Sequence, residues 1–134
     1  MTTDTQIEAE IQAKGKTAPR VTPADVEANI VQEAYFTAED GACGASINQG
    51  LGRAFVTRDH PWALLTFCVL TLSNGFTVTG ESACASPENF DAEIGRKVAR
   101  ENAVQKIWPL MGYSLRNQLA GITPTAHHPS ATQA

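Results

Sequence analysis

The sequence has no long hydrophobic run, no closely spaced cysteine pair and no excess of positive charge. No apolar stretch in the 134 residues approaches the roughly 18 continuous apolar residues that a membrane-spanning helix needs. The N-terminal segment MTTDTQIEAE has neither a basic start nor an apolar core, so we expect no ordinary secretory signal. The net charge of -4 disfavours general affinity for nucleic acids.

Metal-binding spacing is also missing. The three cysteines, Cys43, Cys68 and Cys84, are an odd number in a chain without an evident export signal, which favours reduced thiols in a cytoplasm. Neither they nor the three histidines have the C-x₂₋₄-C or H-x₃₋₅-H spacing of a structural zinc site. We therefore predict no metal site.

Sequence motifs for catalysis are absent as well. No nucleophile-elbow pattern surrounds Ser82 or Cys84. The segment Gly50-Leu51-Gly52 lacks the third glycine of a dinucleotide-binding loop, and no G-K-[ST] occurs. The prediction is a protein that is not an enzyme and holds no cofactor. An active site built from scattered residues leaves no spacing pattern, so hidden catalysis stays an open alternative.

The clearest structural pattern that is present is a β-hairpin at about 64–81. Two runs rich in β-forming residues flank Asn74-Gly75, and this dipeptide favours a tight primed turn because both residues tolerate positive φ. The first run is apolar on both faces, so we expect it to be covered on both sides. The second alternates apolar with polar residues and is expected to be covered on one side only.

Two helix starts follow from capping residues. Thr22-Pro23 with Asp25 has the pattern of a capping box, and we predict a helix over about 23–36. Ser86-Pro87 predicts a second helix over about 87–108 with Ser86 as its N-cap.

The apolar face of this second helix is expected to contain Phe90, Ile94 and Val98, which recur every four residues. Pro109 lacks the N–H that an uninterrupted helix needs, so the helix should stop or kink just before it. A short helix over about 110–120 is expected to follow and to end at Gly121.

The predicted fold class is therefore α+β, a small single domain in which the antiparallel hairpin packs against these helices. The expected organisation is a flexible or loosely helical arm at 1–20, a domain at 21–121, a glycine-rich loop at 37–61 with a short strand near 54–57, and a disordered tail at 122–134.

Several phrases of the sequence are distinctive, among them TGESAC, NFD, IGRKVAREN and IWPLMGY. Together with PRVTPADVEANIVQEAYFTAEDG, the chain over 19–41 and 64–119 closely resembles a family of small bacteriophage and prophage proteins. The family is named after gene product forty-nine of one enterobacterial phage and gene product sixty-six of another. The resemblance implies an origin in a phage or prophage and residence in the host cytoplasm, and it supplies no catalytic residues.

A polar cluster interrupts the apolar pattern of the second long helix and gives the candidate binding site. Its members are Glu81, Ser82, Arg96, Arg100, Glu101, Asn102, Lys106, Trp108 and Tyr113. One interpretation is a solvated helix face with weak surface ion pairs. The other is a polar pocket or partner surface, because arginine beside a flat aromatic ring suits a phosphate, a nucleotide or an acidic protein.

Our leading functional hypothesis is a non-enzymatic phage accessory protein that binds a host or phage protein and so modulates host functions or defence. One alternative is a binder of a small nucleotide-like or phosphate-bearing ligand at the basic helix. Nucleic-acid binding is a further alternative, which the acidic balance disfavours. We also expect possible self-association, through the free edge of the strand after Asn74 or through helices.

Overall fold

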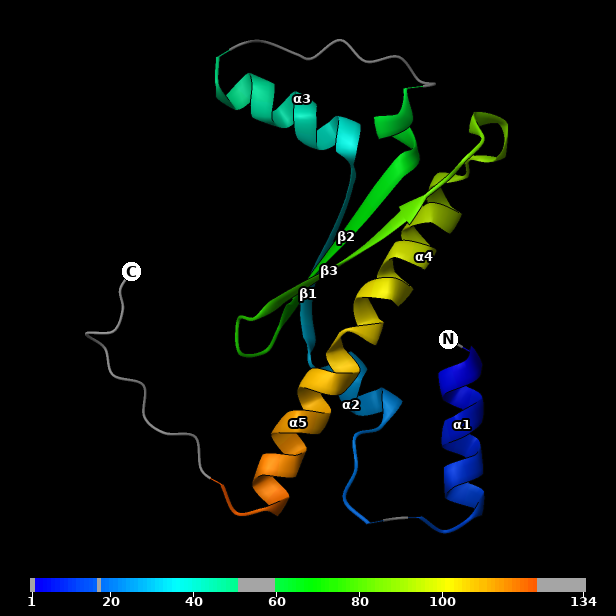
Figure 1. The fold of residues 1–134 in the computed structure, drawn as a ribbon, viewed down its shortest axis with the longest axis vertical. Coiled ribbons are helices and arrows are strands. Elements are labelled where there is room, and N and C mark those ends of the chain that lie inside the picture. Colours follow the sequence, from blue (N-terminus) through cyan, green and yellow to red (C-terminus); the bar gives the residue numbers. More distant parts are fainter. Residues whose placement is uncertain (1, 17, 51–59, 123–134) are drawn as a thin grey trace, which may run out of the picture.

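A three-stranded antiparallel sheet crossed by one long helix organises the molecule (Figure 1). The structure is a computed structural model that describes residues 2–16, 18–50 and 60–122. In chain order these residues form α1 (Thr2–Ala13), α2 (Pro23–Ala28), β1 (Ile30–Thr37), α3 (Ala38–Asn48), β2 (Leu65–Leu72), β3 (Thr77–Ala83), α4 (Ala92–Gln105) and α5 (Ile107–Leu119), with short 3-10 helices at Pro61–Leu64 and Pro87–Asn89. The predicted α+β class is confirmed.

The hairpin of β2 and β3 is confirmed close to the predicted position. Its loop differs from the primed two-residue turn that Asn-Gly predicts. The N–H of Leu72 donates to the carbonyl of Phe76 at 2.8 Å, and the N–H of Gly75 donates to the carbonyl of Leu72 at 2.9 Å. Three residues therefore form the loop, and Gly75 takes the left-handed conformation that such loops require, with φ of +89°.

The predicted helix over 23–36 is wrong beyond its first turns. The capping box exists, because the N–H of Asp25 donates to Thr22 Oγ1 at 3.1 Å and the N–H of Thr22 donates to Asp25 Oδ2 at 3.0 Å. The helix ends at Ala28, and Ile30–Thr37 forms strand β1 instead. This segment is rich in β-branched and aromatic residues, and pairing with β2 decides its conformation.

The predicted loop over 37–61 is wrong for its first part, which is helix α3. A second capping box starts this helix: the N–H of Asp40 donates to Thr37 Oγ1 at 3.1 Å, and the N–H of Thr37 donates to Asp40 Oδ2 at 3.0 Å. Gly41 and Gly44 lie inside the helix. The short strand expected near 54–57 lies outside the described residues.

Helix α4 begins later than predicted. Ser86 makes no capping hydrogen bond, and Pro87 starts only a short 3-10 turn. Asp91 is the N-cap, since its Oδ1 accepts from the N–H groups of Glu93 and Ile94 at 2.9 and 3.0 Å. The later cap leaves Phe90 outside α4.

The buried face of α4 is also different from the predicted one. Ile94 is 59% exposed and Val98 is 42% exposed, whereas the small residues Gly95, Ala99 and Ala103 are buried against the sheet. Small residues are needed because β3 comes very close to the helix axis at Gly80. The larger side chains of Ile94 and Val98 therefore lie on the outer face of α4.

The predicted interruption before Pro109 is confirmed. Helix α4 ends at Gln105, Lys106 links the two helices, and α5 continues in nearly the same direction (Figure 1). The predicted end at Gly121 is confirmed too. Gly121 has φ of +74°, and the N–H of Ile122 donates to the carbonyl of Asn117 at 2.9 Å, which closes a Schellman motif.

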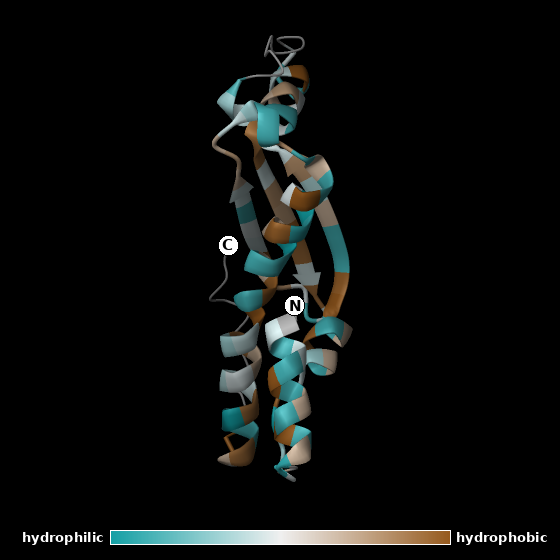
Figure 2. Cartoon of the chain, turned by 90° about the vertical axis from the view of Figure 1, so that its right-hand side faces the viewer, coloured by the Kyte–Doolittle hydropathy of each residue, from teal (hydrophilic) through white to brown (hydrophobic). Residues whose placement is uncertain are grey.

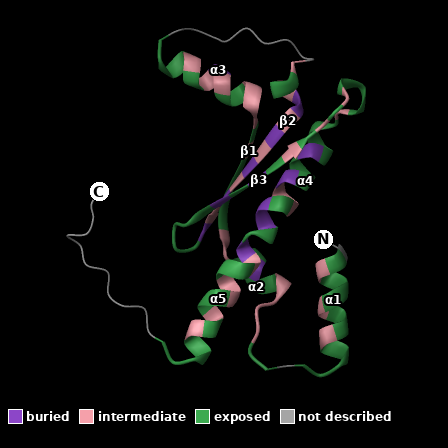
Figure 3. Ribbon diagram, in the orientation of Figure 1, coloured by how far each residue is buried: buried purple, intermediate pink, exposed green. Residues whose placement is uncertain are grey.

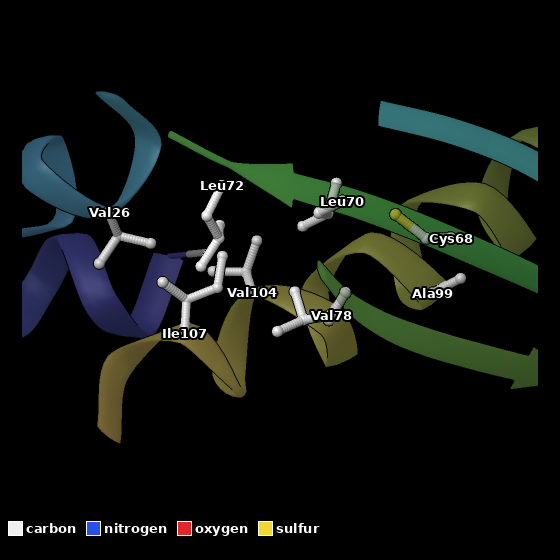
Figure 4. Close-up of a cluster of buried hydrophobic side chains, with 9 residues drawn as sticks. Val26, Cys68, Leu70, Leu72, Val78, Ala99, Val104 and Ile107 are labelled. Atoms are coloured by element: carbon white, nitrogen blue, oxygen red, sulfur yellow. The ribbon is translucent and has the colours of Figure 1, made fainter. Parts of the chain in front are cut away.

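The core lies between one face of the sheet and the two consecutive helices α4 and α5. Leu70, Val78, Val104 and Ile107 converge there with Val26 of α2 (Figure 4). Buried residues follow β2 and the facing side of α4, while α1 and α3 are mostly exposed or half-buried (Figure 3).

The opposite side of the sheet has little cover from the residues that the structure describes, and we call it the open face. It contains Ala34 and Phe36 of β1, Phe67 and Val69 of β2, and Thr79 of β3, which lie in two neighbouring cross-strand rows. The expectation that β2 is covered on both sides is therefore wrong, because its residues on this side are only half-buried. The prediction that β3 is covered on one side only is confirmed.

Helix α1 lies within the stretch expected to be a flexible or loosely helical arm. Arg20 joins it to the rest of the chain through Nη1 and Nη2, each 2.7 Å from a carboxylate oxygen of Glu8. Gln105 of α4 donates to Asp4 at 3.2 Å. Helices α1 and α5 lie at the same end of an elongated molecule, away from α3 (Figures 1 and 2). None of the described helices combines the length and the hydropathy required to cross a bilayer.

Candidate functional site

Arg100, the central residue of the predicted polar cluster, is engaged in packing. Its Nη1 and Nη2 donate to the two carboxylate oxygens of Glu27 at 3.1 and 2.9 Å, and its Nε donates to Glu33 at 2.9 Å. Arg100 lowers the pKa of Glu27, and Glu27 in turn raises the pKa of Arg100. The guanidinium therefore ties α4 to α2 and β1 and has little charge left for a ligand.

Glu81, Ser82 and Asn102 also lie where α4 meets the sheet. Asn102 Nδ2 donates to the backbone carbonyl of Glu81 at 2.8 Å, which fixes α4 to β3. Ser82 is half-buried and pairs with Thr66 in the ladder. These contacts hold elements together.

The remaining members of the predicted cluster point in different directions. Tyr113 is 72% exposed on α5, and Lys106 is exposed at the break between the helices. Trp108 is half-buried, and its Nε1 is a buried donor without a hydrogen-bond partner among the described residues. Glu101 is half-buried on α4. The nine predicted residues therefore do not form one site.

Arg96 lies in a small cavity near aromatic rings, which is the arrangement expected of a nucleotide site. The cavity has a volume of about 100 Å³, and its walls include Tyr35, Phe36 and Phe90. Sites for drug-sized ligands usually enclose about 300–1,000 Å³. A nucleotide does not fit this cavity as the structure has it.

A larger concave surface, which we call the hairpin–α5 groove, lies between the hairpin loop, α2 and α5. Its volume is about 690 Å³. Apolar side chains from three parts of the chain form its walls, principally Val21, Leu72, Phe76, Leu110, Met111 and Leu115. Phe76 is 55% exposed and Leu110 is 40% exposed, so these walls are accessible to a partner.

The two charged residues of this groove already have hydrogen-bond partners. Arg20 is paired with Glu8, and Asp25 accepts the hydrogen bond of the capping box. Asn29 Oδ1 accepts from the N–H and the hydroxyl of Ser73 at 3.1 and 2.5 Å. The groove thus offers apolar walls, neutral polar groups and two charged residues that are already engaged, which suits an uncharged apolar ligand better than a phosphate.

The sequence matches the family model for the phage protein (N4 Gp49/phage Sf6 gene 66) family over residues 21–119. The chain belongs to this family. No curated protein and no solved structure matches it.

The matched family segment contains almost the whole groove. Of the residues that line it, only Arg20 precedes the segment. Helix α1 lies entirely outside it. The groove is thus a property of the part of the chain that this phage protein shares with its family.

The cysteines lie apart from the groove. Cys68 is buried in β2, and burial raises the pKa of its thiol. Cys84 Sγ donates to the carbonyl of Ser86 at 3.1 Å. Within the described ranges, no group of three His, Cys, Asp or Glu side chains lies close enough to hold a metal ion. His127 and His128 lie outside those ranges.

Sequence reasoning missed the groove because its walls come from distant segments. Phe76 directly follows the hairpin loop, and Leu110, Met111 and Leu115 are apolar residues of the short last helix. Each is visible in the sequence as an apolar residue. Only the packing of α5 beside the hairpin end brings them together and leaves them partly uncovered.

Proposed function

We propose that this member of the phage family is a non-enzymatic accessory protein that binds an apolar segment of a host or phage protein in the hairpin–α5 groove, in the host cytoplasm. The observation that carries the proposal is the set of apolar walls of the groove, whose two charged residues already have hydrogen-bond partners. A protein segment that inserts aliphatic or aromatic side chains meets complementary walls there, and its backbone meets neutral amides and hydroxyls on the rim.

The chemistry of the groove favours binding over catalysis. Its ionisable residues, Arg20 and Asp25, are held by Glu8 and by the backbone of Thr22. Both side chains already take part in structural contacts, which supports a binding role for the groove. The groove residues Ser73 and Ser114 have no imidazole among the other residues that line it.

A matched pair of substitutions on α5 tests the proposal. Leu110→Asp places a charge inside the groove, and Leu119→Asp places one on an exposed residue of the same helix outside it. The wild-type protein is used to isolate a partner from host lysate, and the purified partner is then titrated by calorimetry. We expect Leu110→Asp to weaken binding by about tenfold or more, or 1.4 kcal/mol, and Leu119→Asp to leave it unchanged.

Two results would count against the proposal. One is a correctly folded wild-type protein that retains no partner from host cells with or without the phage. The other is a purified partner that binds both variants as tightly as wild type. A thermal shift with a nucleotide that Arg96→Ala abolishes would instead favour the ligand-binding alternative.

A further inference from the structure

Strand β1 is an outer strand of the sheet, and five of its eight residues are exposed. The strand order is β1-β2-β3, so one side of β1 has no neighbour among the described residues. Helix α4 packs on β2 and β3. Along β1, Val31 is 61% exposed and Phe36 is 39% exposed. An outer strand of this kind presents a row of backbone N–H and C=O groups to any strand that approaches.

The devices that usually protect such an edge are scarce in β1. The strand contains no proline and no lysine, and its single charged residue is Glu33. Arg100 neutralises that charge at 2.9 Å. A register shift between Ile30 and Gln32 disturbs only the start of the strand, and the segment from Gln32 to Thr37 is regular. The regular segment is therefore open to pairing.

We propose that β1 pairs with β1 of a second copy of this chain, antiparallel, to form one continuous sheet across a two-fold axis at Ala34. An axis at Ala34 keeps the two Glu33 side chains apart, whereas an axis at Glu33 places these side chains, each held by its own Arg100, directly opposite each other. An axis at Ala34 places alanine opposite alanine, Glu33 opposite Tyr35 and Gln32 opposite Phe36.

A second copy fits this edge for two further reasons. A two-fold pair of identical strands is self-complementary, as an isologous interface requires. The chain carries a net charge of -4, so two copies approach best through surfaces where charge is compensated or absent. The β1 edge is such a surface, and the pairing joins the apolar rows of the two open faces.

Two lysine substitutions in one cross-strand row test the pairing. Ala34 and Thr79 both lie opposite Val69, on the two outer strands, and both are exposed. Ala34→Lys places two ammonium groups together at the axis, whereas Thr79→Lys changes the other edge. In sedimentation velocity over micromolar to submillimolar concentrations we expect wild type and Thr79→Lys to dimerise and Ala34→Lys to remain monomeric. A wild type that stays monomeric, or equal loss of the dimer in both variants, overturns the proposal.

Single cysteines test the register. The variants are made in a Cys84→Ser background, which removes the partly exposed native cysteine. Because Cys43 and Cys68 are buried, the introduced cysteine is then the accessible thiol. Directly opposed residues of antiparallel strands have Cα atoms about 4.5–5.5 Å apart, within the range of a disulfide. Copper-catalysed air oxidation should cross-link Ala34→Cys into a covalent dimer. The same oxidation should form no covalent dimer of Gln32→Cys. If Gln32→Cys forms the covalent dimer and Ala34→Cys does not, the axis at Ala34 is refuted. If neither variant forms a covalent dimer, the pairing of the two β1 strands is refuted.

Discussion

At the scale of single residues, Gly80 decides how closely α4 approaches the sheet. A Cβ atom at this position would lie 2.2 Å from the carbonyl oxygen of Ala99 and 2.3 Å from the nitrogen of Ala103. Both are backbone atoms of α4, so no side-chain rotation relieves the clash. We predict that Gly80→Ala lowers the free energy of unfolding by about 3 kcal/mol, measured by urea denaturation.

Gly112→Ala is the matched control for that measurement. A Cβ at Gly112 meets no heavy atom within 4 Å, and the residue lies inside α5. Alanine has a higher helix propensity than glycine, so this variant should raise the free energy of unfolding by up to about 1 kcal/mol. If Gly80→Ala proves as stable as Gly112→Ala, α4 does not pack on β3 as described.

Arg100 shows how a sequence cluster can mislead at the same scale. Arginine beside acidic and aromatic residues suggests a ligand site, but here Glu27 and Glu33, more than sixty residues away along the chain, bind the guanidinium. No local spacing reveals those two partners. A variant that removes Arg100 would weaken the docking of α4, so a loss of ligand binding in it could not be attributed to the ligand site. Arg96 alone is the informative position.

At the scale of elements, local chemistry predicts some boundaries, but it does not predict how far a segment continues. The capping box at Thr22 is confirmed where the sequence places it, and the helix break predicted before Pro109 is found nearby, at Lys106. Strand β1 was not foreseen, because it follows a helix start directly and its strand conformation depends on pairing with β2, distant in the chain. Helix α3 was missed because glycines outweighed the capping pattern of Thr37 and Asp40.

The Glu8–Arg20 pair links helix α1 to the segment before α2, and this contact makes the docking of α1 pH-dependent. Hydrogen bonds from Arg20 and then Gln12 lower the pKa of Glu8 from 4.5 to about 2. A carboxylate with a lowered pKa stabilises the fold fully above its unfolded value, and this contribution is lost as the pH falls through the folded value. We predict that wild type is more stable than Glu8→Gln above pH 4.5, and that the difference shrinks between pH 4.5 and about 2.

The measurement is chemical denaturation at a series of pH values, with Glu10→Gln as the control. Glu10 is on the same helix and forms an ion pair with the exposed Lys14, so its loss should have a small effect at every pH. A stability difference between wild type and Glu8→Gln that is absent at neutral pH, or that grows in acid, would rule out this role for the pair.

At the scale of the whole molecule, the family segment and the hydrophobic core coincide. Every residue of the buried cluster lies between Val26 and Ile107, inside the matched range 21–119. Helix α1 adds polar links and lines two cavities of about 220 and 200 Å³ beside Trp108. Cavities of this size beneath a helix indicate incomplete packing. The molecule is thus a family domain with an added helix that packs loosely on it.

This arrangement predicts that residues 21–122 fold without α1. The truncation removes none of the buried residues that the structure describes, so we expect a cooperative thermal transition and retained near-UV circular dichroism, with a melting temperature lower by on the order of 5 °C. A chain ending at Lys106 is the control, because it loses the fully buried Ile107 together with α5 and should lose its fixed tertiary structure. If 21–122 instead melts without cooperativity, α1 belongs to the folding unit and the domain boundary at 21 is wrong.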